Sequence, residues 1–395
     1  MKKIMTRLLS LVLLGTFIPS YVLAADWDLD KGSITVSATV ENQTVSQAGG
    51  SPTVDNNPVI TSSSGKTNNT VTITAEKNAT ANVTLENVNI DTGTRGGAAI
   101  TTSGEGNVNI ELDGTNTVQS GNEHAGVEKK DDGTLTITDE NKDGSLTATG
   151  GYRGAGIGGA HYESVSNIAI EGGKVKASGG YLGAGIGGGQ GGSGSNITIS
   201  DGNVTTTGAG AGAGIGGGYE GSGKGITIEG GEVTAQGDLG GAGIGGGISG
   251  TGSDVTISGD AQVKVQGGRA NEDWHKGAAI GNGGTRTTEG NEVSPNTSDL
   301  TVEGFIQIYE PGKNINTDTP DKTIKGQKGD HSWNAGEVTA EAVPESKTAA
   351  YWVCDPEGQS IPYQAQQKDG VLTVTVQADT ASLCGTTGSL GQLEA

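Results

Sequence analysis

Short alternations of apolar and polar residues recur along most of this chain, and each ends in a turn residue. In one segment Ile226-Thr227-Ile228-Glu229 is followed by Gly230-Gly231 and then by Glu232-Val233-Thr234-Ala235. A period of two is typical of a strand with one buried face, and the glycine pair supplies the turn. No apolar i, i+3, i+4 pattern of useful length follows the first residues, so we expect an all-β protein.

The alternating segments repeat at a fixed interval. The motif Gly-Ala-Gly-Ile-Gly-Gly begins at Gly154, Gly183, Gly212 and Gly241, so its isoleucine returns every 29 residues. Such a period marks stacked structural units, each with this motif and two further strands. The pattern predicts a right-handed parallel β-helix, a solenoid with about 29 residues per coil, whose hand we infer from that of parallel crossover connections.

Stacking predicts which side chains enter the core, because residues one coil apart lie about 4.8 Å from each other. Three columns are uniformly apolar and should face inward: Ile168, Ile197, Ile226, Val255; Ile170, Ile199, Ile228, Ile257; and Val175, Val204, Val233, Val263.

The motif itself predicts a surface with almost no side chains. Ala155 and Ile157 should point inward, which leaves Gly154, Gly156 and Gly158 facing outward. Such a face would let a flat polymer approach the backbone closely. The alternative is that the glycines serve tight turns and loops that fold back over the strand.

Segments outside the repeats divide the chain further. Basic residues, an apolar run and a small-residue site before Ala25 form a cleaved secretory signal, and the apolar run is too short to span a membrane. The protein should therefore be secreted and not inserted in a membrane. We expect a signal peptide at 1–24, N-terminal strands or a cap at 25–70, the β-helix at 71–310, a linker at 311–335, and a small C-terminal β unit with a flexible tail at 336–395.

Two cysteines, Cys354 and Cys384, both lie in the last quarter of the chain. In an exported protein a disulfide between them is the default, and a loop of this length would contribute roughly 3 to 4 kcal/mol. We expect it to staple the C-terminal unit.

The net charge of the chain restricts the classes of molecule that it is expected to bind. The chain has 45 acidic and 24 basic residues, a formal net charge of −21, and cleavage of the signal would remove three positive charges. DNA, RNA and anionic lipid are therefore disfavoured. Neutral glycans, basic proteins and cations remain, with Ca²⁺ as a candidate ligand of the scattered carboxylates.

The repeats also resemble known proteins. The segments Val83–Ile90, Ile110–Val118 and Gly144–Gly150, followed by the Gly-Ala-Gly-Ile-Gly-Gly motifs, resemble β-helical repeat proteins secreted by gut and clostridial bacteria. The resemblance covers roughly residues 71–304, and the chain is similar to a clostridial β-helix family that binds acidic plant polysaccharide with calcium. The resemblance implies a carbohydrate-binding protein on or outside a bacterial cell.

Aromatic residues flank the glycine strand. Tyr152 and Tyr181 lie one period apart on one side, and Tyr162 and Tyr219 lie on the other. Exposed aromatic rings hold sugar rings in many binding sites, and loop packing is the alternative role.

The longest interruption of the repeat adds Asp273, Trp274 and His275. Loops inserted into solenoids often carry function, so these residues could form a ligand pocket. Alternatively, the bulky tryptophan caps the last coil.

We expect a secreted or surface-associated carbohydrate-binding module. A polysaccharide lyase or glycosidase is one alternative, but Glu171 and Glu229 lie two coils apart, about 10 Å, and we assign no catalytic residue. A structural or adhesive spacer is the other alternative.

Overall fold

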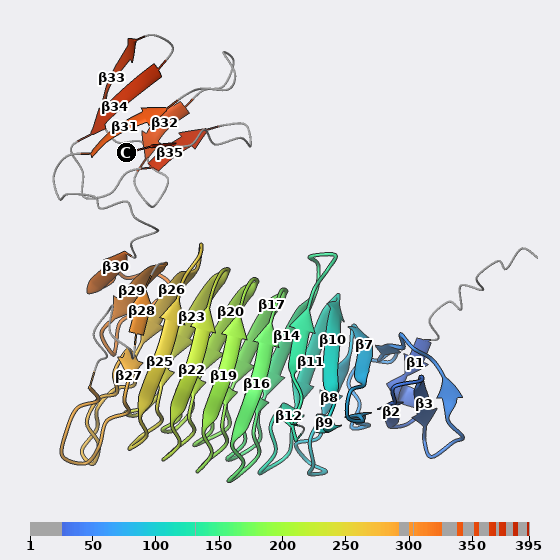
Figure 1. The fold of residues 1–395 in the computed structure, drawn as a ribbon. Coiled ribbons are helices and arrows are strands. Elements are labelled where there is room, and N and C mark those ends of the chain that lie inside the picture. Colours follow the sequence, from blue (N-terminus) through green and yellow to red (C-terminus); the bar gives the residue numbers. More distant parts are fainter. Residues whose placement is uncertain are drawn as a thin grey trace, which may run out of the picture.

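The computed structural model describes residues 26–130, 132–291, 300–302 and 304–325, and the backbone of six short strands beyond them. The signal peptide expected at 1–24 lies outside the described residues. The described chain forms a long stack of parallel strands (Figure 1). Within it, the 3-10 helix η1 (Leu29–Lys31) is the single helical element, and no helix has the length and apolarity needed to cross a bilayer.

Three sheets run along the stack because each coil contributes one strand to each sheet. Sheet A contains, in order, β1 (Asp26–Asp28), β5 (Val59–Thr61), β7 (Thr80–Glu86), β10 (Asn107–Asp113), β13 (Leu135–Thr138), β16 (Val165–Ile170), β19 (Gly194–Ile199), β22 (Gly223–Ile228), β25 (Gly252–Ile257) and β28 (Leu300–Val302). Sheet B contains β4 (Thr53–Val54), β3 (Gln43–Gln47), β2 (Ile34–Ala38), β6 (Val71–Ala75), β9 (Ile100–Gly104), β12 (Val127–Lys129), β15 (Ile157–Gly158), β18 (Ile186–Gly187), β21 (Ile215–Gly216), β24 (Ile244–Gly245) and β27 (Ile280–Gly281). Sheet C contains β8 (Asn89–Asp91), β11 (Thr115–Gln119), β14 (Ser145–Thr149), β17 (Lys174–Ser178), β20 (Asn203–Thr207), β23 (Glu232–Gln236), β26 (Gln262–Gln266), β29 (Phe305–Tyr309) and β30 (Lys322–Lys325).

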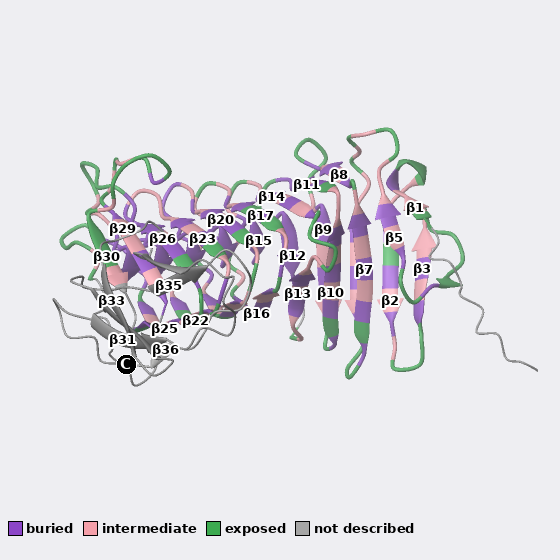
Figure 2. Cartoon of the chain, turned by 90° about the horizontal axis from the view of Figure 1, so that it is seen from above, coloured by how far each residue is buried: buried purple, intermediate pink, exposed green. Residues whose placement is uncertain are grey.

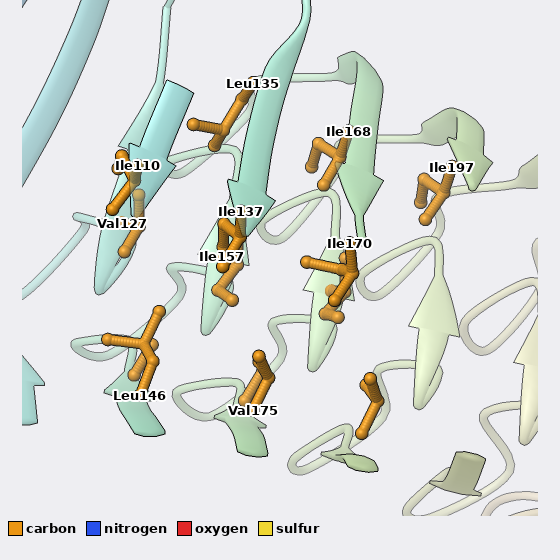
Figure 3. Packing of buried hydrophobic residues seen from close by; sticks show 14 of the residues in the cluster. Ile110, Val127, Leu135, Ile137, Leu146, Ile157, Ile168, Ile170, Val175 and Ile197 are labelled. Atoms are coloured by element: carbon orange, nitrogen blue, oxygen red, sulfur yellow. The ribbon is translucent and has the colours of Figure 1, made fainter. Parts of the chain in front are cut away.

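The register confirms the predicted β-helix. Residues one repeat apart pair directly, as Ile197 does with Ile226 and Ile186 with Ile215. All three predicted apolar columns are buried, with no side chain in them more than 1% exposed. Figure 3 shows side chains from the three sheets, such as Ile168, Ile157 and Val175, converging on the interior. The core is a stack of aliphatic side chains that leaves the outer surfaces polar.

The expected outward glycine face is not a free surface. Gly154, Gly156 and Gly158 are buried, like most residues along the inside of the stack (purple in Figure 2). Gly158 has a φ of +136°, and a Cβ added there would lie 2.1 Å from the carbonyl oxygen of Gly187 in the next coil. Only glycine fits such a close approach. The glycines are therefore structural, because they allow close backbone packing between coils, and this corrects the expectation of a bare face.

Further strands lie at both ends of the stack. Parallel pairing begins at β1 and β2, and the antiparallel strands β3 and β4 cover the first edge of sheet B. At the other end, β30 lies within the expected linker and pairs antiparallel with β29. These antiparallel strands cover sheet edges that would otherwise expose unpaired backbone groups.

The C-terminal segment contains β31 (Val338–Ala342), β32 (Tyr351–Cys354), β33 (Tyr363–Lys368), β34 (Val371–Val376), β35 (Ser382–Gly385) and β36 (Leu393–Glu394). Strands β32 and β35 pair antiparallel, with Cys354 opposite Ser382 and Cys384 opposite Trp352. The two cysteines therefore lie on neighbouring strands, two residues out of register. Their side chains are outside the described residues, and the disulfide stays a prediction.

Candidate ligand-binding site

Two loops per coil flank the glycine strand of sheet B, one before it and one after it. The loops of neighbouring coils are joined, because backbone N–H groups of the second loop donate to carbonyls of the first loop of the preceding coil. These hydrogen bonds measure 2.9 Å in four successive coils: His161 to Glu123, Gln190 to Arg153, Tyr219 to Leu182 and Ile248 to Ala211. Residues that the sequence places on opposite sides of the glycine strand thus come to one loop edge.

The predicted tyrosine pair lies on this edge. Tyr152 and Tyr181 are 44% and 50% exposed, and their rings stack with centroids 5.5 Å apart and planes 12° apart. The Arg153 guanidinium lies 5.0 Å from the centre of the Tyr152 ring, a cation–π distance. The two coils therefore present one continuous aromatic surface with a cation beside it.

Glu123 connects this pair to the tyrosine on the other loop. Its Oε1 lies 3.5 Å from Nη1 of Arg153 and 3.6 Å from Nδ1 of His161. The His161 ring stacks on Tyr162 with centroids 3.9 Å apart, and Tyr162 is 71% exposed. These contacts form a contiguous set that we name the tyrosine strip: Tyr181, Tyr152, Arg153, Glu123, His161 and Tyr162.

Polar atoms along the strip lack partners within the described residues. Nε of Arg153 and Nε2 of His161 are buried with no hydrogen bond, and so are Oε1 of Gln190 and Oε2 of Glu163 in the same loops. A buried polar group without a partner costs about 1 to 3 kcal/mol. The loops beside the strip thus hold buried polar atoms whose hydrogen-bonding capacity is not met within the described residues.

The ring positions depend on glycines in the following coil. A Cβ on Gly210 would lie 2.5 Å from the Tyr181 ring, and one on Gly191 would lie 2.6 Å from the Tyr162 ring. Each tyrosine therefore lies against bare backbone and keeps its outer part in solvent. These glycines make room for the tyrosine rings. They do not themselves form the exposed binding face that the motif led us to expect.

Tyr219 does not join Tyr162. It packs edge-on against Trp274, with ring centroids 6.3 Å apart and planes at 89°, and Arg286 lies 4.9 Å from the centre of the Trp274 ring. Burial raises the pKa of the Tyr219 hydroxyl. Tyr219 and Trp274 therefore pack one loop against another, which favours a structural role.

Asp273 and His275 are exposed beside this cluster. The Asn271 side chain accepts from the backbone N–H groups of Asp273, at 3.0 Å, and Trp274, at 2.8 Å. The carboxylate of Asp273 and the ring of His275 form no hydrogen bond or ion pair with the described part of the chain. The structure does not bring these two residues to the tyrosine strip.

One buried carboxylate near the strip, that of Glu128, was not predicted from the sequence. Glu128 is 1% exposed and pairs in register with Gly158, so it occupies the glycine column one coil earlier. Its oxygens lie 2.7 Å from His124 Nδ1 and 2.7 Å from Lys130 Nζ. The spacing of His124, Glu128 and Lys130 is the available signal, but it does not predict burial.

The hydrogen bond with Glu128 raises the pKa of Lys130 above its ordinary value of 10.5. A raised pKa adds stability that is fully present below pH 10.5 and is lost as the pH rises through the folded-state value. We expect Lys130→Met to cost about 1 kcal/mol at pH 8, the upper end for a partly exposed ion pair, and less at pH 11.5. Denaturant unfolding of both proteins at the two pH values measures this, and an equal difference at both would contradict it.

The described residues contain no group of three or more His, Cys, Asp or Glu side chains arranged to hold a metal ion. Calcium therefore has no assigned ligands and stays a prediction.

Comparison with known proteins supports the repeat assignment. The family model described as Beta helix repeat matches residues 142–161, 168–190, 197–219 and 226–248. Searches of curated proteins and of solved structures give no significant match. The four matches coincide with the coils whose strands stack in register, and the chain is a β-helical repeat protein.

Proposed function

We propose that the mature chain is secreted or held at the cell surface, and that its tyrosine strip binds a polysaccharide or a cell-surface glycan. The observation that carries the proposal is the continuity of the strip, which joins three exposed tyrosines from two loop families through Arg153, Glu123 and His161. The β-helix repeat fold itself is consistent with a structural or adhesive solenoid, and glycan binding would give that solenoid its adhesive contact.

The chemistry of the strip suits sugars. A sugar ring combines an apolar face of C–H groups with hydroxyls around its rim. Aromatic rings contact the former, and the partly exposed guanidinium of Arg153 and carboxylate of Glu123 can bond the latter. The strip is built on short loops joined by backbone hydrogen bonds, so little ordering should accompany binding.

Binding is favoured over catalysis at this place. Glycoside hydrolysis uses two carboxyl groups on either side of the scissile bond. Within the strip the carboxylate of Glu123 is shared by two basic side chains, and the nearby Oε2 of Glu163 is buried, so no exposed carboxyl pair faces the tyrosines. We therefore assign no general acid or base to the strip.

The test is retention of the mature chain on insoluble and gel-embedded polysaccharides, neutral and acidic, with and without Ca²⁺. We expect Tyr162→Ala and the pair Tyr152→Ala/Tyr181→Ala to weaken binding about three- to tenfold per ring, the loss expected for one aromatic contact of about 0.5 to 1.5 kcal/mol. Tyr162→Phe keeps the ring and is the matched control, which should retain most of the affinity.

Two results would overturn the proposal. One is that no polysaccharide retains the chain under any condition. The other is that the triple variant without all three tyrosines binds as tightly as the unmodified chain while circular dichroism shows the same strand content.

A further inference from the structure

The outer face of sheet C carries a second feature, on a different side of the coil from the glycine strand. A hollow of about 300 Å³ lies over β20, β23, β26 and β29. Its floor consists of polar side chains from four successive coils, including Asn203, Thr205, Glu232, Thr234, Lys264 and Gln307, and Asn316 lines it from the loop between β29 and β30. Thr205, Thr234, Lys264 and Gln307 form one column in register.

The loop that bounds the hollow is held in place. Gln266 Nε2 donates to the carbonyls of Glu310, at 2.7 Å, and Lys313, at 3.1 Å. The carboxylate of Asp321 accepts from the backbone N–H of Glu310 at 2.8 Å and from the ammonium of Lys313. Ile315, next to Asn316, is 3% exposed. The hollow is therefore preformed, and the loop limits it at the last coil of the stack.

Several polar groups of the floor are available to bond a ligand. Within the described residues, the side chains of Thr205, Thr234 and Lys264 form no hydrogen bond or ion pair. Glu232 accepts a hydrogen bond from Asn203 Nδ2 at 3.0 Å, and its second oxygen is free in the same part of the chain. Hydroxyl, amide, carboxylate and ammonium groups thus present both donors and acceptors on neighbouring coils about 4.8 Å apart.

Charge and polarity select the class of ligand. Lys264 balances Glu232, so the floor has no net charge in a chain with a formal charge of −21. Val233 is the one apolar residue that lines the hollow, and it points into the core with 1% exposure. An ionic ligand would find no excess of opposite charge, and a peptide would find no apolar anchor.

We propose that this hollow binds the end of an uncharged oligosaccharide. A chain of sugar rings lying along the columns of sheet C would meet successive rows of hydroxyl and amide groups, and its end would abut the loop that carries Asn316. The site does not depend on the tyrosine strip, because none of the strip residues lines it.

The experiment is calorimetric titration of the mature chain with cellotetraose, xylotetraose, mannotetraose and maltotetraose. Trigalacturonate and a hexapeptide of glycine and serine are the charged and peptide controls. We expect at least one uncharged tetrasaccharide to bind, and Thr234→Trp, which fills the hollow, to weaken it at least tenfold. Thr147→Trp is the matched control, because Thr147 lies in the same outward column on β14, beyond the hollow, and it should leave the affinity unchanged.

The variant Tyr152→Ala/Tyr181→Ala/Tyr162→Ala separates this proposal from the proposed function. Binding to the hollow should survive in this variant, even if retention on polysaccharide is lost. The inference is overturned if no uncharged tetrasaccharide binds at millimolar concentration, if trigalacturonate or the peptide binds in its place, or if Thr234→Trp and Thr147→Trp have equal effects.

Discussion

Replacing Gly187 by alanine is expected to lower the free energy of unfolding by about 3 kcal/mol or more, from combined backbone strain and overpacking. Gly187 has a φ of +135°, and an added Cβ would lie 1.9 Å from the carbonyl oxygen of Gly216. The obstructing atom belongs to the backbone of the next coil, so no side chain can rotate to make room. Gly158, Gly216 and Gly245 show the same geometry, and a shift at one coil would be opposed by its neighbours.

Gly65→Ala is the control for this prediction. Gly65 also has a positive φ, +97°, but nothing lies within 4 Å of an added Cβ. Gly65→Ala should lower the free energy of unfolding by backbone strain alone, about 1 to 2 kcal/mol. Denaturant unfolding followed by circular dichroism measures both variants, and hydrogen exchange should show the largest loss of protection in the coils around Gly187. Equal destabilisation by the two substitutions would mean that the contact with Gly216 does not contribute to the loss of unfolding free energy.

The stacking and the core were predictable because both depend on short, strict periods. Alternation within a strand sets which side chains point inward, and the 29-residue interval sets which residues pair between coils. Ile197 pairs with Ile226, and both are buried, as these two periods require. Neither inference needs knowledge of the loops.

The burial of the glycine strand could not be predicted, because the two periods do not show what packs against its outward side. Alternation correctly places Gly156 and Gly158 opposite the inward isoleucine, but it does not reveal what covers that side. Backbone atoms of the next coil lie against it, such as the carbonyl oxygen of Gly187 beside Gly158. The pair Gly150-Gly151 before the motif and the pair Gly158-Gly159 at its end were a signal for close backbone packing.

The candidate sites were predictable in part. The stacking of Tyr152 on Tyr181 follows from their spacing of one period. The link to Tyr162 runs through Glu123, which belongs to a degenerate coil with no motif to draw attention to it. The hollow on sheet C depends on the loop around Asn316, a segment that composition suggests is only a linker.

Replacing Ile228 by alanine should destabilise the chain by about 2 to 5 kcal/mol, the range for truncating a large aliphatic side chain in a packed core. Ile228 is fully buried and pairs in register with Ile199 and Ile257, so the vacated space is bounded by side chains already packed in their own coils. Because each coil contacts mainly its neighbours, hydrogen exchange should increase most in β19, β22 and β25. Thr227→Ala, on the outward side of the same strand, should cost at most about 1 kcal/mol, and Ile228→Val about 0.5 to 1.5 kcal/mol. If Ile228→Ala and Thr227→Ala lowered the unfolding free energy equally, the inward column would not be the source of stability.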